Sequence, residues 1–271
     1  MTEYQLIAID MDGTLLTSDK RILPETVRDM EVAANSGKTV VLCTGRSVVE
    51  LSEYRKELQS IRYGVLGSGA CVYDFAKGAP IYEKALDRSE VLAAAEVAER
   101  YDAMLHLMES GRMVVRKDLL HHMEDFGMGV YQPMFEKLAD PVEDIREEID
   151  RLNTVLKVLI YFRMPEDRAE GYDALKGMPF EFAFAEKTSL ELSPAGVNKG
   201  DGLRRLAEHL GFSLEQVIAV GDADNDRTML TAAGLAAAMG NAAEEIKGLA
   251  DVVTLDNDHN GVGEVIRKYL L

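Results

Sequence analysis

The sequence predicts an α/β fold, in which a doubly wound parallel sheet forms a core and carries an inserted α+β unit. Short apolar runs alternate with amphipathic stretches near both ends of the chain, whereas strand pairs joined by turns fill the middle. The 271 residues also exceed the common size of a single domain. Because ligands of parallel sheets bind at the carboxyl ends of strands, polar residues after the apolar runs are the first candidates for a site.

The two ends of the chain supply the predicted core. Pro24 and Gly37 bound an amphipathic stretch, which predicts a helix because proline favours the first helical turn and glycine follows the last. Apolar runs rich in valine and isoleucine predict the strands. We expect strands at 5–10, 38–44, 63–69 and 216–221, helices at 24–37, 47–58, 200–211 and 225–234, and the same alternation through 235–271.

The middle of the chain predicts antiparallel pairs. A hairpin over 70–86 turns at Lys77 and Gly78, and a second strand pair surrounds Ser110 and Gly111. We expect strands at 103–108, 112–117, 155–162, 180–186 and 189–194, helices at 89–101 and near 166–176, and two acidic helical stretches after residue 117. Residues 84–190 are therefore predicted to form the inserted unit, and residues 1–83 and 191–271 the core.

Composition excludes several classes of protein. The net charge of −17 opposes binding of nucleic acid or acidic membranes through the bulk surface. No window is apolar for long enough to span a bilayer, and the first residues enter a strand directly, so we expect a cytoplasmic protein. The two cysteines, Cys43 and Cys71, lie in apolar segments and are expected to be buried free thiols.

Four polar clusters follow apolar runs or open helices: "DMDGT" from residue 10, "CTGR" from 43, "NKGDG" from 198 and "GDADND" from 221. Asp10 and Asp12 can project to the same side, because side chains of an extended segment alternate. Asp222 ends another strand, so three carboxylates could gather at one sheet edge, an oxygen-rich environment suited to Mg²⁺. Lys199 and Thr44 could bring a cation and a hydroxyl donor to the same place.

In this order and spacing, "DMDGTLL", "LCTGR", "NKGDGL" and "GDADND" resemble the four motifs of the haloacid dehalogenase-like phosphatase superfamily. The insertion after the third strand, with "AAAMGNA" at 236–242 and "NGVGEVI" at 260–266, resembles the Cof-type branch. The resemblance implies a Rossmann-like core, an α/β cap over the active site and a Mg²⁺-dependent phosphatase that works through an aspartyl-phosphate.

The resemblance also implies a role for each motif residue. Asp10 would attack phosphorus, and Asp12 would be the general acid and base. The side chains of Asp10 and Asp222 and the backbone carbonyl of Asp12 would ligate Mg²⁺. The residues expected to bind phosphate are Gly13, Thr14, Thr44, Gly45, Lys199 and Asn225, Thr44 and Lys199 counting also as catalytic, and those expected to support the site are Arg46, Ser68 and Asp226.

Some of these residues have ordinary structural explanations. Thr44 could cap the following helix, and Asn225 and Asp226 are residue types that favour helix N-termini. Where relatives commonly carry asparagine before Gly69 and Ala70, this chain has Ser68, which puts one contact to phosphate or substrate in doubt.

Other functions also fit parts of the pattern. A phosphotransferase or phosphomutase could use the same scaffold, because an aspartyl-phosphate can pass to a sugar hydroxyl as well as to water. A receiver-like signalling module or an inactive phosphate-binding protein is a further alternative. The spacing within 84–190 dictates no ligand, and Glu109, Arg112 and Arg116 are explained equally well as solvated turn charges. We expect a small phosphorylated metabolite, with sugar phosphates as the first class, and no particular oligomeric state.

Overall fold

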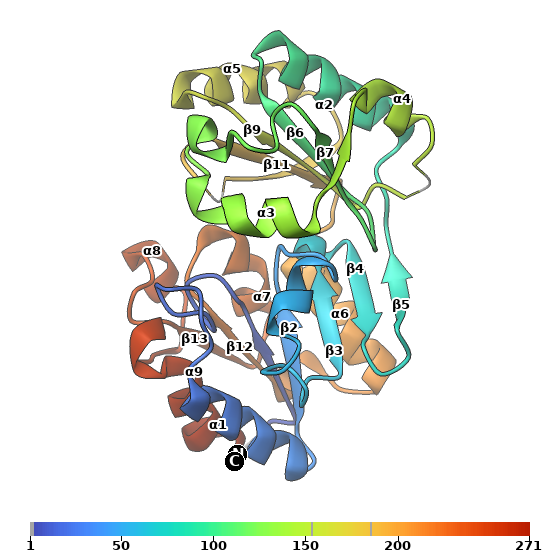
Figure 1. Cartoon of the computed structure of the whole chain (residues 1–271). Coiled ribbons are helices and arrows are strands. Elements are labelled where there is room, and N and C mark those ends of the chain that lie inside the picture. The colour runs from blue at the N-terminus through green and yellow to red at the C-terminus, as the bar shows by residue number, and fades with distance from the viewer. Residues whose placement is uncertain (1–2, 153, 185) are drawn as a thin grey trace. The chain divides into compact units, whose positions relative to one another are not determined.

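The computed structural model describes residues 3–152, 154–184 and 186–271, and Figure 1 colours them along the chain. The chain forms two compact units. The first runs to Gly45 and continues through Glu53–Tyr82 and Asn198–Leu271, and the second comprises Arg46–Ser52 and Glu83–Val197. The sequence predicts a core domain of residues 1–83 and 191–271 and a cap domain of residues 84–190. That these segments are domains that fold separately stays a prediction.

The first unit is built on an eight-stranded sheet of order β14-β13-β12-β1-β2-β3-β4-β5. Neighbouring strands from β14 to β3 pair in parallel, and β4 pairs antiparallel with β3. This sheet confirms the predicted α/β class with a parallel core. The strands are β1 (Leu6–Ile9), β2 (Thr39–Cys43), β3 (Tyr63–Leu66), β4 (Cys71–Asp74), β5 (Ala79–Glu83), β12 (Val217–Gly221), β13 (Leu235–Ala238) and β14 (Val252–Val253).

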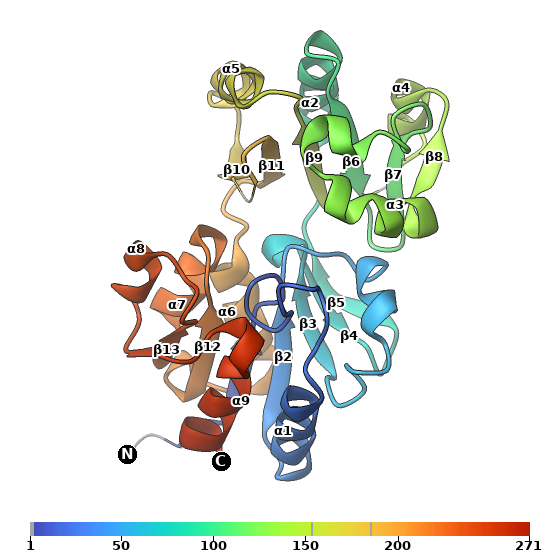
Figure 2. The same ribbon diagram turned by 60° about the vertical axis from the view of Figure 1, so that its left-hand side comes forward.

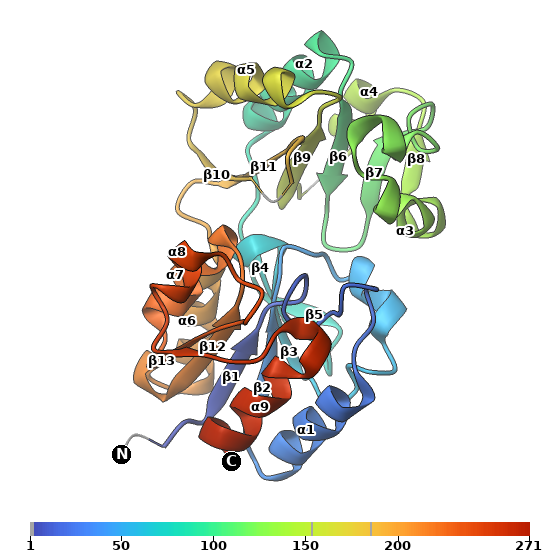
Figure 3. The ribbon, with the colours of Figure 1, turned by 90° about the vertical axis from the view of Figure 1, so that its left-hand side faces the viewer.

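Helices cover both faces of this sheet because its central strands are apolar on both sides. Ala8 and Val41 pack with Leu203, Leu206 and Met229 in one buried cluster. The helices that carry these last three residues are α6 (Lys199–Leu210) and α7 (Arg227–Ala232), which contact each other. On the opposite face lie α1 (Pro24–Asn35) and α9 (Gly261–Val265), which Figure 3 shows in front of the strands. The short helix α8 (Glu244–Lys247) follows β13.

The second unit contains a six-stranded sheet of order β10-β11-β9-β6-β7-β8, mostly antiparallel, as predicted for an α+β insertion (Figure 2). Leu105, Leu107, Val158 and Ile160 face a core shared with α2, and Met104 and Met108 face a second core containing Phe135 of α3. The strands are β6 (Met104–Met108), β7 (Met113–Arg116), β8 (Asp140–Val142), β9 (Lys157–Tyr161), β10 (Phe180–Ala183) and β11 (Ser189–Pro194), and the helices are α2 (Arg88–Arg100), α3 (Gln132–Leu138), α4 (Ile145–Ile149) and α5 (Pro165–Leu175).

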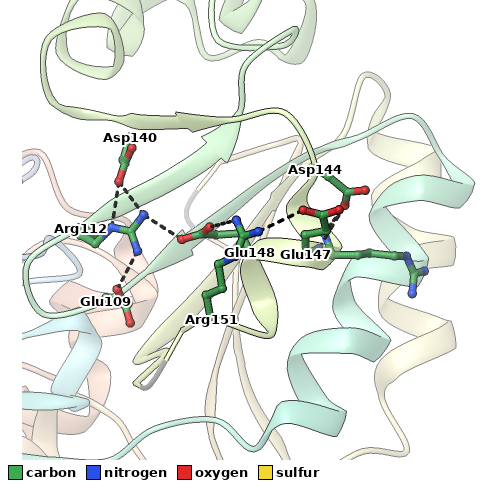
Figure 4. A network of polar contacts seen from close by, with 8 residues as sticks. Glu109, Arg112, Asp140, Asp144, Glu147, Glu148 and Arg151 are labelled. Carbon is green, nitrogen blue, oxygen red and sulfur yellow. Dashed lines mark hydrogen bonds and ion pairs between the residues drawn. The ribbon is translucent and has the colours of Figure 1, made fainter.

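A charged network joins the turn before β7 to β8 and α4 within the second unit (Figure 4). The Arg112 guanidinium lies 2.6 Å from Asp140, 2.8 Å from Glu148 and 3.6 Å from Glu109. Asp144 caps α4 by accepting hydrogen bonds from the backbone of Arg146 and Glu147. Arg112 and Glu109 are therefore bound into the scaffold of this unit.

The helix predicted over 47–58 is wrong. That segment contains only a 3-10 helix (Glu50–Tyr54), followed by turns. Ser47 and Glu50 bond reciprocally, with the Ser47 backbone donating to Glu50 Oε2 at 2.6 Å, and the segment is divided between the two units at Ser52. Val49 packs into the methionine-rich core of the second unit, so the local periodicity does not build one continuous helical face.

Across residues 3–152, 154–184 and 186–271, no helix combines the length and apolar character needed to cross a bilayer. Both cysteines are free and buried, as predicted.

Candidate active site

The predicted carboxylates lie at the carboxyl edge of the first unit's sheet. Asp10 follows β1 and Asp222 follows β12, and these strands pair directly in parallel. Thr44 follows β2 on the other side of β1. The backbone N–H of Asp10 donates to Val220 across the strands at 3.0 Å. Parallel pairing therefore brings residues more than two hundred positions apart in the sequence to one edge.

Lys199 is the buried cation of this edge. It is the first residue of α6, whose N-cap Asn198 accepts a hydrogen bond from the Asp201 backbone. The Lys199 ammonium donates to Asp10 Oδ1 at 2.5 Å and to Asp226 Oδ1 at 2.6 Å, and all three side chains are buried. The nucleophile candidate and the lysine thus form one charge-assisted contact.

Asp226 connects this cation to the loop after β12. While its Oδ1 accepts from Lys199, its Oδ2 accepts from the backbone N–H groups of Asp222 at 2.9 Å and Ala223 at 3.0 Å. Gly221 fits closely below it, because a Cβ there would lie 2.6 Å from the Asp226 carboxylate. Both oxygens of Asp226 are therefore engaged in orienting Lys199 and Asp222.

Gly13 and Thr14 pack directly on Asp222. Gly13 has φ +84, and a Cβ at that position would lie 2.3 Å from Asp222 Oδ2. The Thr14 hydroxyl donates to Asp222 Oδ1 at 2.7 Å. The backbone turn after β1 consequently fixes the orientation of the Asp222 carboxylate, and glycine is required both by the turn and by the close approach.

The charge balance of this cluster fits a divalent cation. Carboxylate oxygens of Asp10, Asp222 and Asp226 lie within 4.8 Å of one another. Burial raises the pKa of Asp10 well above its ordinary value, and repulsion from Asp226 adds to that effect. Burial likewise raises the pKa of Asp222 to about 6. Hard oxygen ligands with excess negative charge are the environment that Mg²⁺ prefers, so the residues present fit the ion.

Lys199 itself stays charged. Burial alone would lower the pKa of its ammonium group, but the neighbouring charges of Asp10 and Asp226 outweigh burial and raise that pKa. A permanently charged ammonium at this position can neutralise part of the charge on a bound phosphoryl group.

Asp12 is placed differently from Asp10. Its carboxylate forms an ion pair with the Lys20 ammonium at 2.8 Å, and both side chains are about one-third exposed. Among the described residues, the cluster of carboxylates that could hold a metal consists of Asp10, Asp222 and Asp226, and the Asp12 side chain is not part of it. The expected ligation of Mg²⁺ through the Asp12 backbone carbonyl stays a prediction.

The predicted residues Thr44 and Ser68 lie where β2 and β3 end. Ser68 donates its backbone N–H to the Thr44 carbonyl at 3.0 Å, joining the ends of β2 and β3. Ser68 is buried and has φ 58, a left-handed conformation that asparagine adopts more readily than serine. Gly69 lies against the Asn198 backbone, because a Cβ would come within 2.1 Å of its carbonyl oxygen. This loop therefore packs at the start of α6.

The structure describes three further predicted residues, Gly45, Arg46 and Asn225. Gly45 is the last residue of its segment in the first unit, whereas Arg46 belongs to the second unit and donates to Met134 Sδ there at 3.8 Å. Asn225 lies half-buried in the 3-10 helix (Asp224–Asp226). Within the first unit, the structure thus brings together Asp10, Lys199, Asp222 and Asp226, with Gly13 and Thr14 packed against Asp222.

Two residues of this neighbourhood were not predicted. Asn241 donates its Nδ2 to the Gly13 carbonyl at 2.8 Å and accepts the Asn257 backbone N–H at 3.1 Å. It lies in the "MGNA" stretch, whose resemblance to the family was the available signal. The sequence does not indicate a role for Lys20, because its contact with Asp12 depends on the folding of the intervening hairpin.

Comparisons with known proteins support one assignment. A family model for haloacid dehalogenase-like hydrolase matches residues 7–266. The relative YcsE of Bacillus subtilis, named 5-amino-6-(5-phospho-D-ribitylamino)uracil phosphatase, is 27% identical over 99% of this chain and 97% of its own. Pyridoxal phosphate phosphatase YbhA of Escherichia coli is 27% identical over 98% of this chain and 99% of its own. A solved haloacid dehalogenase-like hydrolase from Bacteroides thetaiotaomicron is 27% identical, covers 98% of this chain and 99% of its own, and has a TM-score of 0.86.

Proposed function

The chain belongs to the haloacid dehalogenase-like hydrolases, as its four motifs predict, and is a phosphatase of that family; we propose that it hydrolyses phosphate monoesters of small metabolites with Asp10 as nucleophile and Mg²⁺ as cofactor. The observation that carries this proposal is the contact of Lys199 with both Asp10 and Asp226. This contact sets a positive charge beside the buried carboxylates of Asp10 and Asp226, and the half-buried carboxylate of Asp222 lies in the same cluster.

In the first step, an Asp10 carboxylate oxygen forms a bond to phosphorus while the bond from phosphorus to the substrate oxygen breaks. Asp12 gives its proton to that leaving oxygen, so the product is a neutral alcohol. Lys199 offsets negative charge on Asp10 and the transferred group, and Thr44 and the backbone around Gly13 orient the phosphoryl oxygens.

In the second step, water attacks the phosphorus of the aspartyl-phosphate, and the bond between phosphorus and Asp10 breaks. Asp12 takes the proton from this water and returns to its starting state. The products are inorganic phosphate and free enzyme, so each cycle consumes one water and balances.

The side chains of Asp10 and Asp222, with the backbone carbonyl of Asp12, would hold Mg²⁺. When bound, the ion supplies positive charge that neutralises the carboxylates and the phosphoryl oxygens. Thr14 and Gly13 keep the Asp222 carboxylate in a single orientation, and Asp226 holds the adjoining backbone. Of the other predicted residues, Gly45 and Asn225 are proposed to bind phosphate, and Arg46 and Ser68 to support the site.

The proposed substrates are small phosphorylated metabolites, with sugar phosphates as the first class to test. The names of YcsE and YbhA specify phosphorylated small molecules, which supports the general class. Hydrolysis is proposed ahead of phosphotransfer, a phosphomutase reaction or phosphoryl storage. A cytoplasmic location and an undetermined oligomeric state accompany the proposal as predictions.

The test measures phosphate release from p-nitrophenyl phosphate and a panel of sugar phosphates, with Mg²⁺ and with a chelator. We expect turnover with Mg²⁺, its loss with the chelator, and a loss of at least about 10³-fold in Asp10→Asn, because the covalent step is removed. Sugar-phosphate consumption without phosphate release would instead favour phosphotransfer. Folded, Mg²⁺-loaded protein that turns over no member of the panel would count against hydrolysis.

A further inference from the structure

The contact between Lys20 and Asp12 suggests a role for a residue that none of the four motifs contains. The Lys20 ammonium donates to Asp12 Oδ1 at 2.8 Å across eight residues of sequence. Both side chains are about one-third exposed, and ion pairs of that kind contribute little to folding stability. Stability alone therefore gives a weak reason for placing a lysine here.

The backbone around Lys20 is held firmly in place. Leu16 and Ile22 pair as a short antiparallel bridge, and the Thr17 backbone donates to Arg21 at 2.8 Å. Lys20 closes the turn with φ 58, a left-handed conformation that is unfavourable for a residue other than glycine. Its N–H donates to the Thr17 carbonyl at 2.8 Å.

Contacts with the rest of the first unit anchor the same hairpin on two sides. The Tyr54 hydroxyl donates to the Lys20 carbonyl at 3.1 Å. On the other side, Ser18 donates to the Asp258 carboxylate through its backbone at 2.9 Å and its hydroxyl at 2.7 Å. The ammonium is thus presented to Asp12 from a fixed backbone.

We propose that Lys20 is a positioning residue: by donating to Oδ1 it orients the Asp12 carboxyl group so that the other oxygen, Oδ2, carries the proton that passes to the leaving oxygen. This inference rests on the proposed function, because it assigns Asp12 the proton transfer of the first step. In that step the bond from phosphorus to the leaving oxygen breaks, the bond to Asp10 forms, and the Asp12 proton moves to the alcohol. Lys20 makes no bond to the reacting atoms.

Leaving groups of different basicity separate positioning from a general loss of activity. An alkyl phosphate needs a proton on its departing oxygen, whereas p-nitrophenolate departs without one. We expect Lys20→Met to lower kcat/KM roughly tenfold for glycerol or sugar phosphate but less than about twofold for p-nitrophenyl phosphate, since an acid contributes about 10²- to 10⁴-fold when well placed. Lys20→Arg should restore most of the loss because it keeps the donor.

Arg21→Met is the matched control on the same hairpin. Arg21 forms an exposed ion pair with Asp19 at 3.2 Å, so its removal should change neither substrate. Thermal unfolding of every variant checks that the hairpin remains folded. An equal loss on both substrates in Lys20→Met, no loss on either, or the same effect in Arg21→Met would overturn the role of Lys20.

Asp12→Asn distinguishes the two levels of inference. It should lower kcat/KM, which reports the first step alone, more for an alkyl phosphate than for p-nitrophenyl phosphate, and by a larger factor than Lys20→Met does. If Asp12→Asn shows that selectivity and Lys20→Met does not, only the positioning role fails. If Asp12→Asn leaves the ratio of kcat/KM for the two substrates unchanged, the acid role proposed for Asp12 and the positioning role of Lys20 fail together.

Discussion

Gly13 helps to set the geometry of the carboxylate cluster, because the absence of a Cβ leaves room for Asp222. The left-handed backbone of Gly13 turns the chain after β1, and its bare Cα permits the Asp222 carboxylate to lie against it. Thr14 then donates to the same carboxylate. Both the backbone conformation at residue 13 and its contact with Asp222 therefore require glycine.

Gly13→Ala should weaken Mg²⁺ binding and activity beyond its effect on folding. Its Cβ would lie 2.3 Å from Asp222 Oδ2, so the carboxylate must move. Gly37→Ala is the matched control, because Gly37 has the same φ of +84 and no atom within 4 Å of the added Cβ. We expect both variants to lose about 1–2 kcal/mol of folding free energy from backbone strain. Isothermal titration and activity assays should show an additional loss in Gly13→Ala alone, and equal Mg²⁺ affinity in the two variants would contradict this reading.

At this scale, the sequence allows the main participants to be named but not all their partners. Asp10, Asp222 and Lys199 follow strands or open a helix, so the rules for parallel sheets predict their common edge. Lys20 and Asn241 were missed because hairpin folding and a distant loop bring them there. The bridging contacts of Asp226 were also unpredictable, since a helix N-terminus explains an aspartate equally well.

Among the elements of the second unit, charged side chains hold the turn before β7 against β8 and α4. Arg112 contacts Asp140 and the largely buried carboxylate of Glu148. Together with Glu109, these carboxylates orient the guanidinium, so loss of Arg112 leaves Glu148 buried with weaker compensation.

Arg112→Met should therefore destabilise the protein by about 1–3 kcal/mol, the cost of weakening a buried polar group's contacts. Arg88→Met is the matched control, because Arg88 pairs with Asp150 where both side chains are more than half exposed. We expect the control to change stability by less than about 1 kcal/mol. Chemical denaturation measures both, and a difference of zero between them would refute the importance of the network.

Most elements were predictable because their patterns agree with their final surroundings. The apolar runs of β1, β2 and β12 are buried on both faces, and α1 begins at the predicted proline. The exception is 47–58, where helical periodicity competes with packing in two units. The three-residue strand β8 was also missed, since so short a segment carries too few residues for a pattern.

Across the whole molecule, negative charge exceeds positive charge, and part of the excess lies at the proposed cation site. The net charge is −17, and three carboxylates of the first unit are gathered around the end of β1. Burial raises the pKa of Asp222 from 3.8 to about 6, and that of Asp10 also rises. Ionising these groups in the metal-free fold therefore costs folding free energy.

This charge arrangement predicts how Mg²⁺ and pH act on stability. Because folding raises the pKa of Asp222, protonated Asp222 contributes to the free energy of unfolding. This contribution is complete below the unfolded pKa of 3.8 and is lost as pH rises through the folded pKa of about 6. Metal-free protein should thus lose stability across that window. Since Mg²⁺ binds the ionised carboxylates, its stabilising effect should be larger at about pH 7.5 than at about pH 5, reaching about 2.7 kcal/mol at a hundredfold excess over Kd.

Thermal unfolding with Mg²⁺ or chelator at both pH values measures this effect. Asp222→Asn is the control, because it removes a proposed ligand and should abolish most of the Mg²⁺ response. An equal Mg²⁺ shift at both pH values, or an undiminished shift in Asp222→Asn, would contradict the proposed site.

The most direct test of Asp10 as the nucleophile is to locate the phosphoryl group during turnover. Wild-type protein and Asp12→Asn, in which the second step should be slow, would be mixed with Mg²⁺ and p-nitrophenyl phosphate and quenched in acid. Mass spectrometry of the peptides should find one phosphoryl group on Asp10, more abundant in Asp12→Asn and absent from Asp10→Asn. A phosphoryl group on another residue, or full turnover by Asp10→Asn, would contradict the role of Asp10 as the nucleophile.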